Sequence, residues 1–279
     1  MSRHVTRMFC AVAAGLALVA SGLATGCAAG AVRTSLSGRT AQSAIICCVS
    51  AVAATSVRNA WAVGGGLRSL ILHWNGTAWK RVPSPGPAGS LSSVAAISVG
   101  DAWAVGDTSS PAGRGGPLIL HWNGKTWKQV PGPNRSAGTV LDGVAATSAG
   151  DAWAVGYTGL GPHTCRHCTT LILHWNGTAW KRVPSPNPSA GSVLYGVAAI
   201  SAGNAWAVGY TPSLTGSTLI LHWTGTAWEH VPSPNPTPDH GENLTGVAAA
   251  SARNAWVVGY AGGGGQVLIA HWNGVSWMT

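Results

Sequence analysis

Fifteen tryptophans arranged as five triplets constrain the fold of this chain more than any other feature. The first Trp of a triplet lies in an A-W-[AV]-V-G segment, the second in [LI]-[LA]-H-W, and the third follows five residues later. The second tryptophans recur at spacings of 48, 53, 48 and 49 residues. A period near 50 is typical of solenoids and propellers, because one such repeat cannot bury its apolar face alone. We therefore expect one repeat domain over residues 47–279.

The third repeat indicates how each repeat divides into strands. Residues 141–148, 152–156, 171–175 and 178–183 each have the length and composition of a strand. Asn176-Gly177 predicts a hairpin between the last two strands, because both residues tolerate positive φ. The proline-rich run 184–188 ends the fourth strand, because proline cannot donate to a β-ladder. Each repeat is thus expected to form four antiparallel strands.

The size of the side chains predicts a radial arrangement. The first strand of every repeat contains Val-Ala-Ala, whereas the third and fourth carry Trp, His, Lys and Arg. Inner strands of a propeller converge on an axis and have room only for small residues. We therefore predict an all-β protein, a five-bladed β-propeller of four-stranded antiparallel blades. Its blades would cover 47–85, 86–133, 134–186, 187–236 and 237–279; either a strand within 31–36 completes the last blade, or the chain is truncated.

A hydrophobic strand ending in Gly, a variable loop, an aromatic residue before a tight turn and a following Trp resemble kelch-type β-propeller repeats. The chain is more similar still to repeats of exported actinobacterial proteins that carry [LI]-x-H-W-N-G-T-x-W and P-S-P-N-P strings. It departs from the kelch pattern in having one Gly rather than a pair after the second strand of most repeats. The resemblance implies a propeller scaffold and carries no activity.

The N-terminus predicts export. Arg3 and Arg7 precede an apolar stretch, 8–24, that is short for a membrane span. Residues 24–27 resemble a lipobox, which makes Cys27 the expected lipidation site and sole membrane anchor; ordinary secretory cleavage near Ala28 is the alternative. Residues 1–27 would then be a signal peptide and 28–46 a tether. We expect an extracytoplasmic protein, either a membrane lipoprotein or secreted.

Loop lengths predict where a ligand would bind. The turns after the first and third strands keep constant length, whereas the loops after the second and fourth vary, and variable loops on a rigid scaffold commonly carry function. The residue that opens the loop after the second strand gives the candidate ligand-binding residues Asp107, Tyr157, Tyr210 and Tyr260. The alternative is that these tyrosines only pack between blades.

One irregular segment concentrates cysteine and histidine. A disulfide is expected in an exported protein, either Cys165 with Cys168 or bridges from these two to Cys47 and Cys48. A zinc site at His163, Cys165, His167 and Cys168 is the weaker alternative, because the ligands are closer than in usual zinc motifs. We expect no other metal and no cofactor.

Composition limits the function. The formal net charge is +9, but the basic residues are dispersed and no nucleic-acid-binding motif is present. We expect a non-catalytic scaffold that binds a protein or glycan partner at the cell surface. The alternatives are a glycoside hydrolase, for which the seven acidic residues leave Asp107 and Asp142 as candidates, and a purely structural envelope protein. The sequence leaves the oligomeric state open.

Overall fold

Each repeat folds into four antiparallel strands, which we group as units 1 to 5 in chain order. The computed structural model describes residues 20–21, 48–65, 68–110, 113–133, 138–159, 167–212, 217–233, 241–261 and 265–279. Unit 1 comprises β2 (Cys48–Ser56), β3 (Asn59–Gly65), β4 (Ser69–Trp74) and β5 (Trp79–Arg81). Unit 2 comprises β6 (Gly89–Ser98), β7 (Asp101–Ser110), β8 (Gly113–Trp122) and β9 (Trp127–Gln129). Unit 3 comprises β10 (Thr139–Ser148), β11 (Asp151–Thr158), β12 (Thr169–Trp175) and β13 (Trp180–Val183). Unit 4 comprises β14 (Val193–Ser201), β15 (Asn204–Thr211), β16 (Ser217–Trp223) and β17 (Trp228–His230). Unit 5 comprises β18 (Asn243–Ser251), β19 (Asn254–Ala261), β20 (Gln266–Trp272) and β21 (Trp277–Met278).

The units fan out from their first strands, as a propeller requires. Strands pair in sequence order within every unit, and the first strands of successive units lie side by side. The prediction of a propeller of four-stranded antiparallel sheets, with the alanine-rich strand innermost, is confirmed. Units 1 and 2 share one extended sheet because Gly65 pairs with Ser90. Strand β1 (Ala20–Ser21) pairs with β2 and lies against β18.

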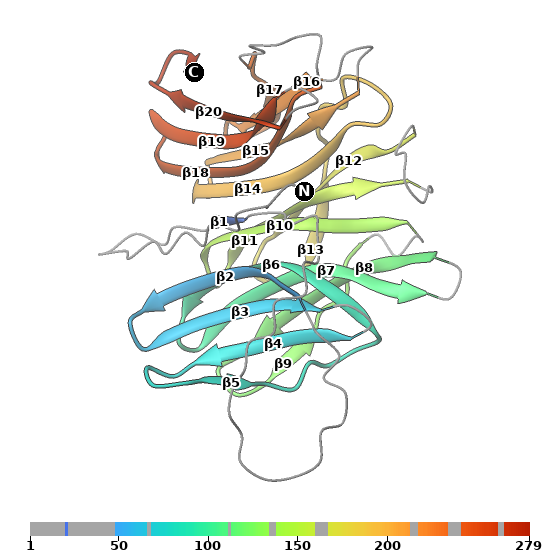
Figure 1. The fold of residues 1–279 in the computed structure, drawn as a ribbon, viewed down its shortest axis with the longest axis vertical. Helices are drawn as coiled ribbons and strands as arrows, with labels where there is room; N and C mark the ends of the chain where they lie inside the picture. The colour runs from blue at the N-terminus through green and yellow to red at the C-terminus, as the bar shows by residue number, and fades with distance from the viewer. Residues whose placement is uncertain are drawn as a thin grey trace, which may run out of the picture.

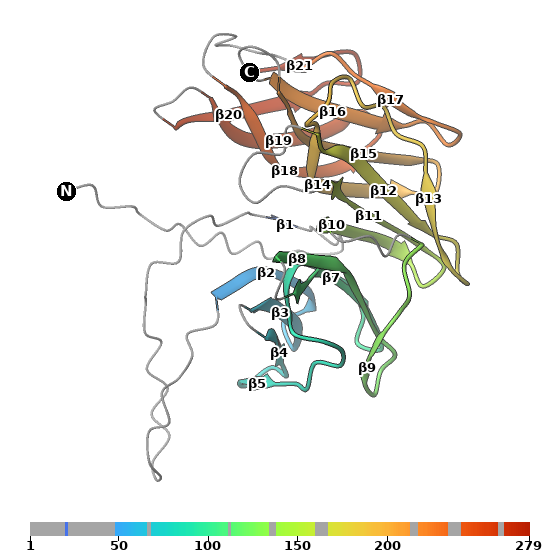
Figure 2. The ribbon, with the colours of Figure 1, turned by 90° about the vertical axis from the view of Figure 1, so that its right-hand side faces the viewer.

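The units occupy an arc with units 1 and 5 at its two ends (Figure 2). In that view unit 1 extends downward and unit 5 upward, and units 2 to 4 fill the side between them. The strand that we predicted within 31–36 lies outside the described residues. No helix in the described part of the chain has the length and apolar composition to span a bilayer.

A glycine ends the A-W-[AV]-V-G segment because the two innermost strands approach closely there. A Cβ atom on Gly156 would lie 2.0 Å from the Val140 carbonyl oxygen, and one on Gly209 would lie 2.0 Å from that of Val193. Non-bonded atoms cannot approach so closely, so any side chain would force the strands apart. The same repeat position therefore requires glycine in every unit.

The hairpin between the third and fourth strands has four loop residues. In unit 3 the side-chain oxygen of Asn176 accepts hydrogen bonds from the backbone N–H groups of Thr178 (3.1 Å) and Ala179 (3.0 Å). Gly177 has a φ of +89°, which favours glycine. Asn-Gly thus marks a hairpin as predicted, but β13 begins at Trp180 rather than at residue 178.

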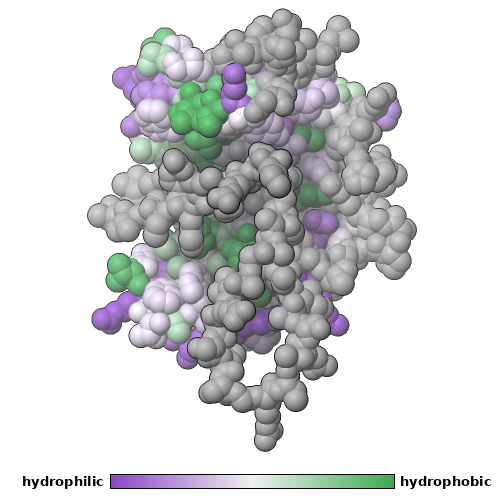
Figure 3. Space-filling model, in the orientation of Figure 1, coloured by the Kyte–Doolittle hydropathy of each residue, from purple (hydrophilic) through white to green (hydrophobic). Residues whose placement is uncertain are grey.

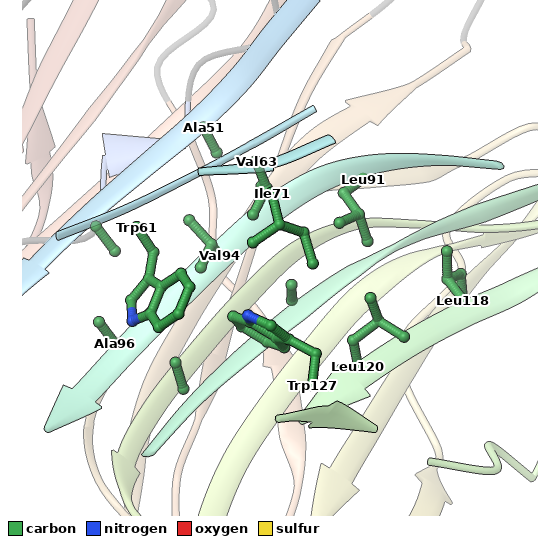
Figure 4. Packing of buried hydrophobic residues seen from close by; sticks show 13 residues of the cluster. Ala51, Trp61, Val63, Ile71, Leu91, Val94, Ala96, Leu118, Leu120 and Trp127 are labelled. Atoms are coloured by element: carbon green, nitrogen blue, oxygen red, sulfur yellow. The ribbon is translucent and has the colours of Figure 1, made fainter. Parts of the chain in front are cut away.

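The core lies between units rather than within any one of them. Trp61 of unit 1 is fully buried and packs edge-on against Trp127 of unit 2, with ring centroids 5.0 Å apart and planes at 86° (Figure 4). Trp103, Trp153 and Trp206 repeat this contact with the third tryptophan of the following unit. T-shaped aromatic pairs are favourable beyond the area they bury. Each tryptophan triplet therefore joins two neighbouring units.

Candidate functional site

All four tyrosines of the chain gather at the variable-loop end of units 3 to 5. Tyr157 is buried with Cys168 and the first residues of β10 and β14, and Tyr195 and Tyr210 pack against this group. Tyr195 also lies close enough to Tyr210 and Tyr260 for their charges to affect its ionisation. We call Tyr157, Tyr195, Tyr210 and Tyr260 the tyrosine cluster.

A β-bulge positions Tyr195, and a cross-strand pair positions Tyr260. Tyr195 is the extra residue of a bulge in β14, between Leu194 and Gly196, and Asp142 is the corresponding residue of β10. An extra residue in a bulge is left out of the ladder and can be re-aimed. Tyr260 lies opposite Asn243 in the β18–β19 pair, and the Asn243 side chain donates a 3.0 Å hydrogen bond to the Tyr260 hydroxyl.

The ionisation of Tyr195 follows from these neighbours. Burial, the negative charge of Asp142 and the nearby Tyr260 and Tyr210 together raise the pKa of Tyr195 to about 12, and a hydrogen bond with Asn243 opposes this rise. The Tyr195 phenol is therefore protonated at neutral pH and can both donate and accept hydrogen bonds.

Exposure decides which members of the cluster a ligand could reach. The exposed fraction is 8% for Tyr157 and 44% for Tyr260, and Tyr195 and Tyr210 are half-buried. Tyrosine offers a large amphipathic surface at small entropic cost, which suits contact with a sugar ring or an apolar side chain. Tyr195, Tyr210 and Tyr260 form the accessible part of the site, with Asp142 beside Tyr195.

The predicted ligand-binding residues divide between two places. Tyr210 and Tyr260 both lie near Tyr195, whereas Tyr157 at the same repeat position is buried in packing. Asp107 is half-buried in β7 of unit 2, two units away from Tyr210. Sequence reasoning missed Tyr195, although one signal was available. Tyr195 is aromatic at a repeat position occupied elsewhere by Ser50, Ser92, Asp142 and Thr245.

The cysteine-rich segment is only partly described. Cys48 and Cys168 are both disulfide-bonded, whereas Cys27, Cys47, Cys165 and His163 lie outside the described residues. Cys168 is buried beside Tyr157, so its disulfide lies next to the tyrosine cluster. His167 is exposed. Within the described ranges, no group of three or more His, Cys, Asp or Glu side chains could hold a metal ion.

The histidine of each third strand is structural. His174 Nε2 lies 2.7 Å from Oδ1 of Asp151, the first residue of β11, and its ring stacks on Trp153 with ring centroids 4.2 Å apart. The other units repeat both contacts, with Asn59, Asp101, Asn204 or Asn254 as the hydrogen-bond partner. These hydrogen bonds and stacked rings stabilise the end of each unit that carries the turns of constant length. That end lies opposite the tyrosine cluster.

Comparison with known proteins supports the fold. No protein-family model and no curated protein matches the chain. The chain is similar to the fucose-specific lectin from Aleuria aurantia, with a TM-score of 0.55, 11% identity, and coverage of 80% of this chain and 73% of the lectin. It is also similar to a PL25 ulvan lyase, with a TM-score of 0.50, 11% identity, and coverage of 82% and 66%. A structure of YCF48 bound to a D1 peptide gives a TM-score of 0.49 at 19% identity; the match covers 80% of this chain and spans 65% of YCF48. The likenesses to the lectin and the lyase support a β-propeller.

Proposed function

We propose that the protein is a non-catalytic, extracytoplasmic β-propeller scaffold that binds a glycan or protein partner at the cell surface through the tyrosine cluster. The observation that carries the proposal is the convergence of Tyr195, Tyr210 and Tyr260 beside Asp142 at one end of three adjacent units. Aromatic rings that stack and a carboxylate that accepts hydrogen bonds are the groups that recognise sugars and peptides. The finer architecture belongs to the same proposal: five kelch-like units over residues 47–279, anchored by a lipid on Cys27.

The Tyr195 phenol is suited to a binding role. A hydroxyl that stays protonated offers a ligand one donor and one acceptor without developing charge. The fucose-specific Aleuria aurantia lectin has the same fold, but the preference for a glycan here comes from the exposed tyrosine rings and not from that likeness.

Binding by the full chain to a glycan array and to isolated envelope fractions tests the proposal. Tyr260→Ala should weaken binding at least tenfold, on the order of 1.4 kcal/mol, because it removes the most exposed ring of the cluster. Two control variants should bind as wild type. In Val275→Ala the changed residue lies in the exposed hairpin at the opposite end of unit 5 from Tyr260. In Trp256→Ser it lies on the same face of β19 as Tyr260, four residues away. Binding that Tyr260→Ala leaves unchanged, or no binding by the wild-type chain, would contradict the proposal.

A glycoside hydrolase is the second candidate, favoured by two buried carboxyl groups. Asp142 and Glu242 have exposed fractions of 8% and 0%, and both lie at the variable-loop end of their units. Glycoside hydrolysis requires an acid and a nucleophile or base from such a pair. Release of new reducing ends from a bound glycan, lost in Asp142→Asn, would favour the hydrolase; binding without product favours the scaffold.

A further inference from the structure

Unit 5 exposes large apolar side chains on its outward face, at repeat positions that are buried in other units. Trp256, Val258 and Ile269 have exposed fractions of 49%, 44% and 48%. The corresponding residues of unit 4 are Trp206, Val208 and Ile220, each with an exposed fraction of 0%. These unit 4 residues are buried because unit 5 covers them. We call Trp256, Val258 and Ile269 the leading face; Figure 3 shows a hydrophobic patch over unit 5.

Unit 1 exposes the complementary set. Val49, Val52 and Trp79 have exposed fractions of 49%, 44% and 45%, and we call them the trailing face. Their counterparts in unit 2 are Leu91, Val94 and Trp127, at 0%, 1% and 3%. Those three side chains are buried against unit 1. The trailing face therefore lacks the neighbour that every later unit has.

The internal interfaces show how the two faces fit together. At the junction of units 4 and 5, Trp206 contacts Trp277 edge-on at 5.3 Å and 84°, and Trp272 at 5.2 Å. The junction of units 1 and 2 repeats this arrangement with Trp61, Trp127 and Trp122. At the ends of the arc, Trp256 occupies the repeat position of Trp206, and Trp79 occupies that of Trp277. The leading and trailing faces are thus the two halves of an interface that the molecule already forms four times.

We propose that the leading face of one copy of this chain binds the trailing face of a second copy, head to tail. Units 1 and 5 lie at opposite ends of the arc (Figure 2), and both faces remain exposed within one copy. The matching partner must supply a tryptophan, and the first Trp of the chain is Trp61, so residues 1–46 cannot supply one. Strand β1 pairs with β2, where Ala20 lies opposite Val52 of the trailing face. The tryptophans of the two faces, Trp256 and Trp79, lie on a second and a fourth strand, away from that pairing.

The chemistry of the interface favours association. Contiguous exposed apolar surface on a soluble protein commonly marks an interaction site, and buried tryptophans dominate such interfaces. The two surfaces differ, so the contact is heterologous: it forms a closed ring of copies if the rotation between them closes and an open chain otherwise. This inference does not depend on a ligand at the tyrosine cluster.

Mass measurement by analytical ultracentrifugation over a range of concentrations tests the proposal with the full chain. The wild-type chain should associate, and Trp256→Ser and Trp79→Ser should each raise the dissociation constant at least tenfold. A mixture of these two variants should form dimers with one copy of each, because one variant retains an intact trailing face and the other an intact leading face. Val275→Ser, exposed in a hairpin away from both faces, should associate as wild type.

Three results would overturn the proposal: a wild-type chain that stays single at every concentration, association that persists in the Trp79→Ser and Trp256→Ser double variant, or a mixture of single variants that does not associate. Circular dichroism and thermal unfolding of each variant establish that it is folded. Ligand binding by Trp256→Ser, measured separately, keeps failure of this proposal distinct from failure of the proposed function.

Discussion

The four junctions between units and the two ends of the arc present the same residues in opposite environments. Trp206 and Trp256 occupy the same repeat position, and each stacks on the histidine of its own unit, with ring centroids 4.1 and 4.2 Å apart. Their exposed fractions nevertheless differ, at 0% for Trp206 and 49% for Trp256. The strand pairing within units 4 and 5 is likewise the same. The difference shows that the repeat specifies each unit locally, whereas burial of its tryptophans depends on a neighbour.

The largest expected effect sharpens this contrast. Trp153→Ala should destabilise the protein by about 3–5 kcal/mol, because it opens a cavity between units 3 and 4 where the indole contacts Trp228 and Trp223. Trp256→Ala should cost less than about 1 kcal/mol in the single chain, because half of the indole is already exposed and no following unit packs on it. Urea unfolding monitored by circular dichroism, at concentrations below self-association, measures both.

Equal costs for the two tryptophan variants would contradict the contrast between junctions and ends. Val275→Ala, at a fully exposed hairpin position, is the control for a change that touches neither environment and should leave the unfolding midpoint unchanged.

The sequence predicted the parts of the fold that repeat and missed those that depend on one residue or on which units have a neighbour. The tryptophan spacing, the Asn-Gly hairpin and the Val-Ala-Ala segment recur in the repeats, so strand order and the innermost strand could be inferred. The place of Tyr195 depends on a bulge, and a bulge leaves no period in the sequence. The exposure of Trp256 depends on whether a neighbour covers unit 5, and the repeat motif is the same in covered and uncovered units.

A second prediction concerns the glycine that ends the A-W-[AV]-V-G segment, a constraint that applies in units at junctions and at the ends alike. Gly156→Ala and Gly259→Ala should both destabilise their units by about 1–3 kcal/mol, because a Cβ atom would lie 2.0 Å from the Val140 oxygen and 1.9 Å from the Asn243 oxygen. The clash arises within a unit, so the two costs should agree although the tryptophans differ. Gly265→Ala is a poor control because its φ is +69°, whereas Gly150→Ala meets only a contact at 3.9 Å and should be nearly neutral. Hydrogen exchange of each unit measures the effect locally, and protection of unit 5 that Gly259→Ala leaves intact would contradict the shared constraint.

The smallest expected effect concerns pH and the histidines that stack on the tryptophans. Burial lowers the pKa of His222 from its ordinary 6.5, and the charge of Glu229 opposes that shift. The unfolded chain therefore binds more protons than the folded chain once the pH falls below 6.5, so stability should decrease as the pH drops through that value and level off below the folded pKa. His222→Gln should flatten the decrease, and Glu229→Gln, which removes the opposing charge, should steepen it. Thermal unfolding midpoints between pH 7.5 and pH 5 measure the slope.

A second histidine contributes to the same pH dependence. Burial also lowers the pKa of His73, so His222→Gln alone should keep part of the slope. The double variant His222→Gln with His73→Gln should lose this remaining part. A double variant with the wild-type slope would show that the pH dependence arises elsewhere and that burial of these two rings, one at the end of the arc and one beside a junction, does not couple to folding.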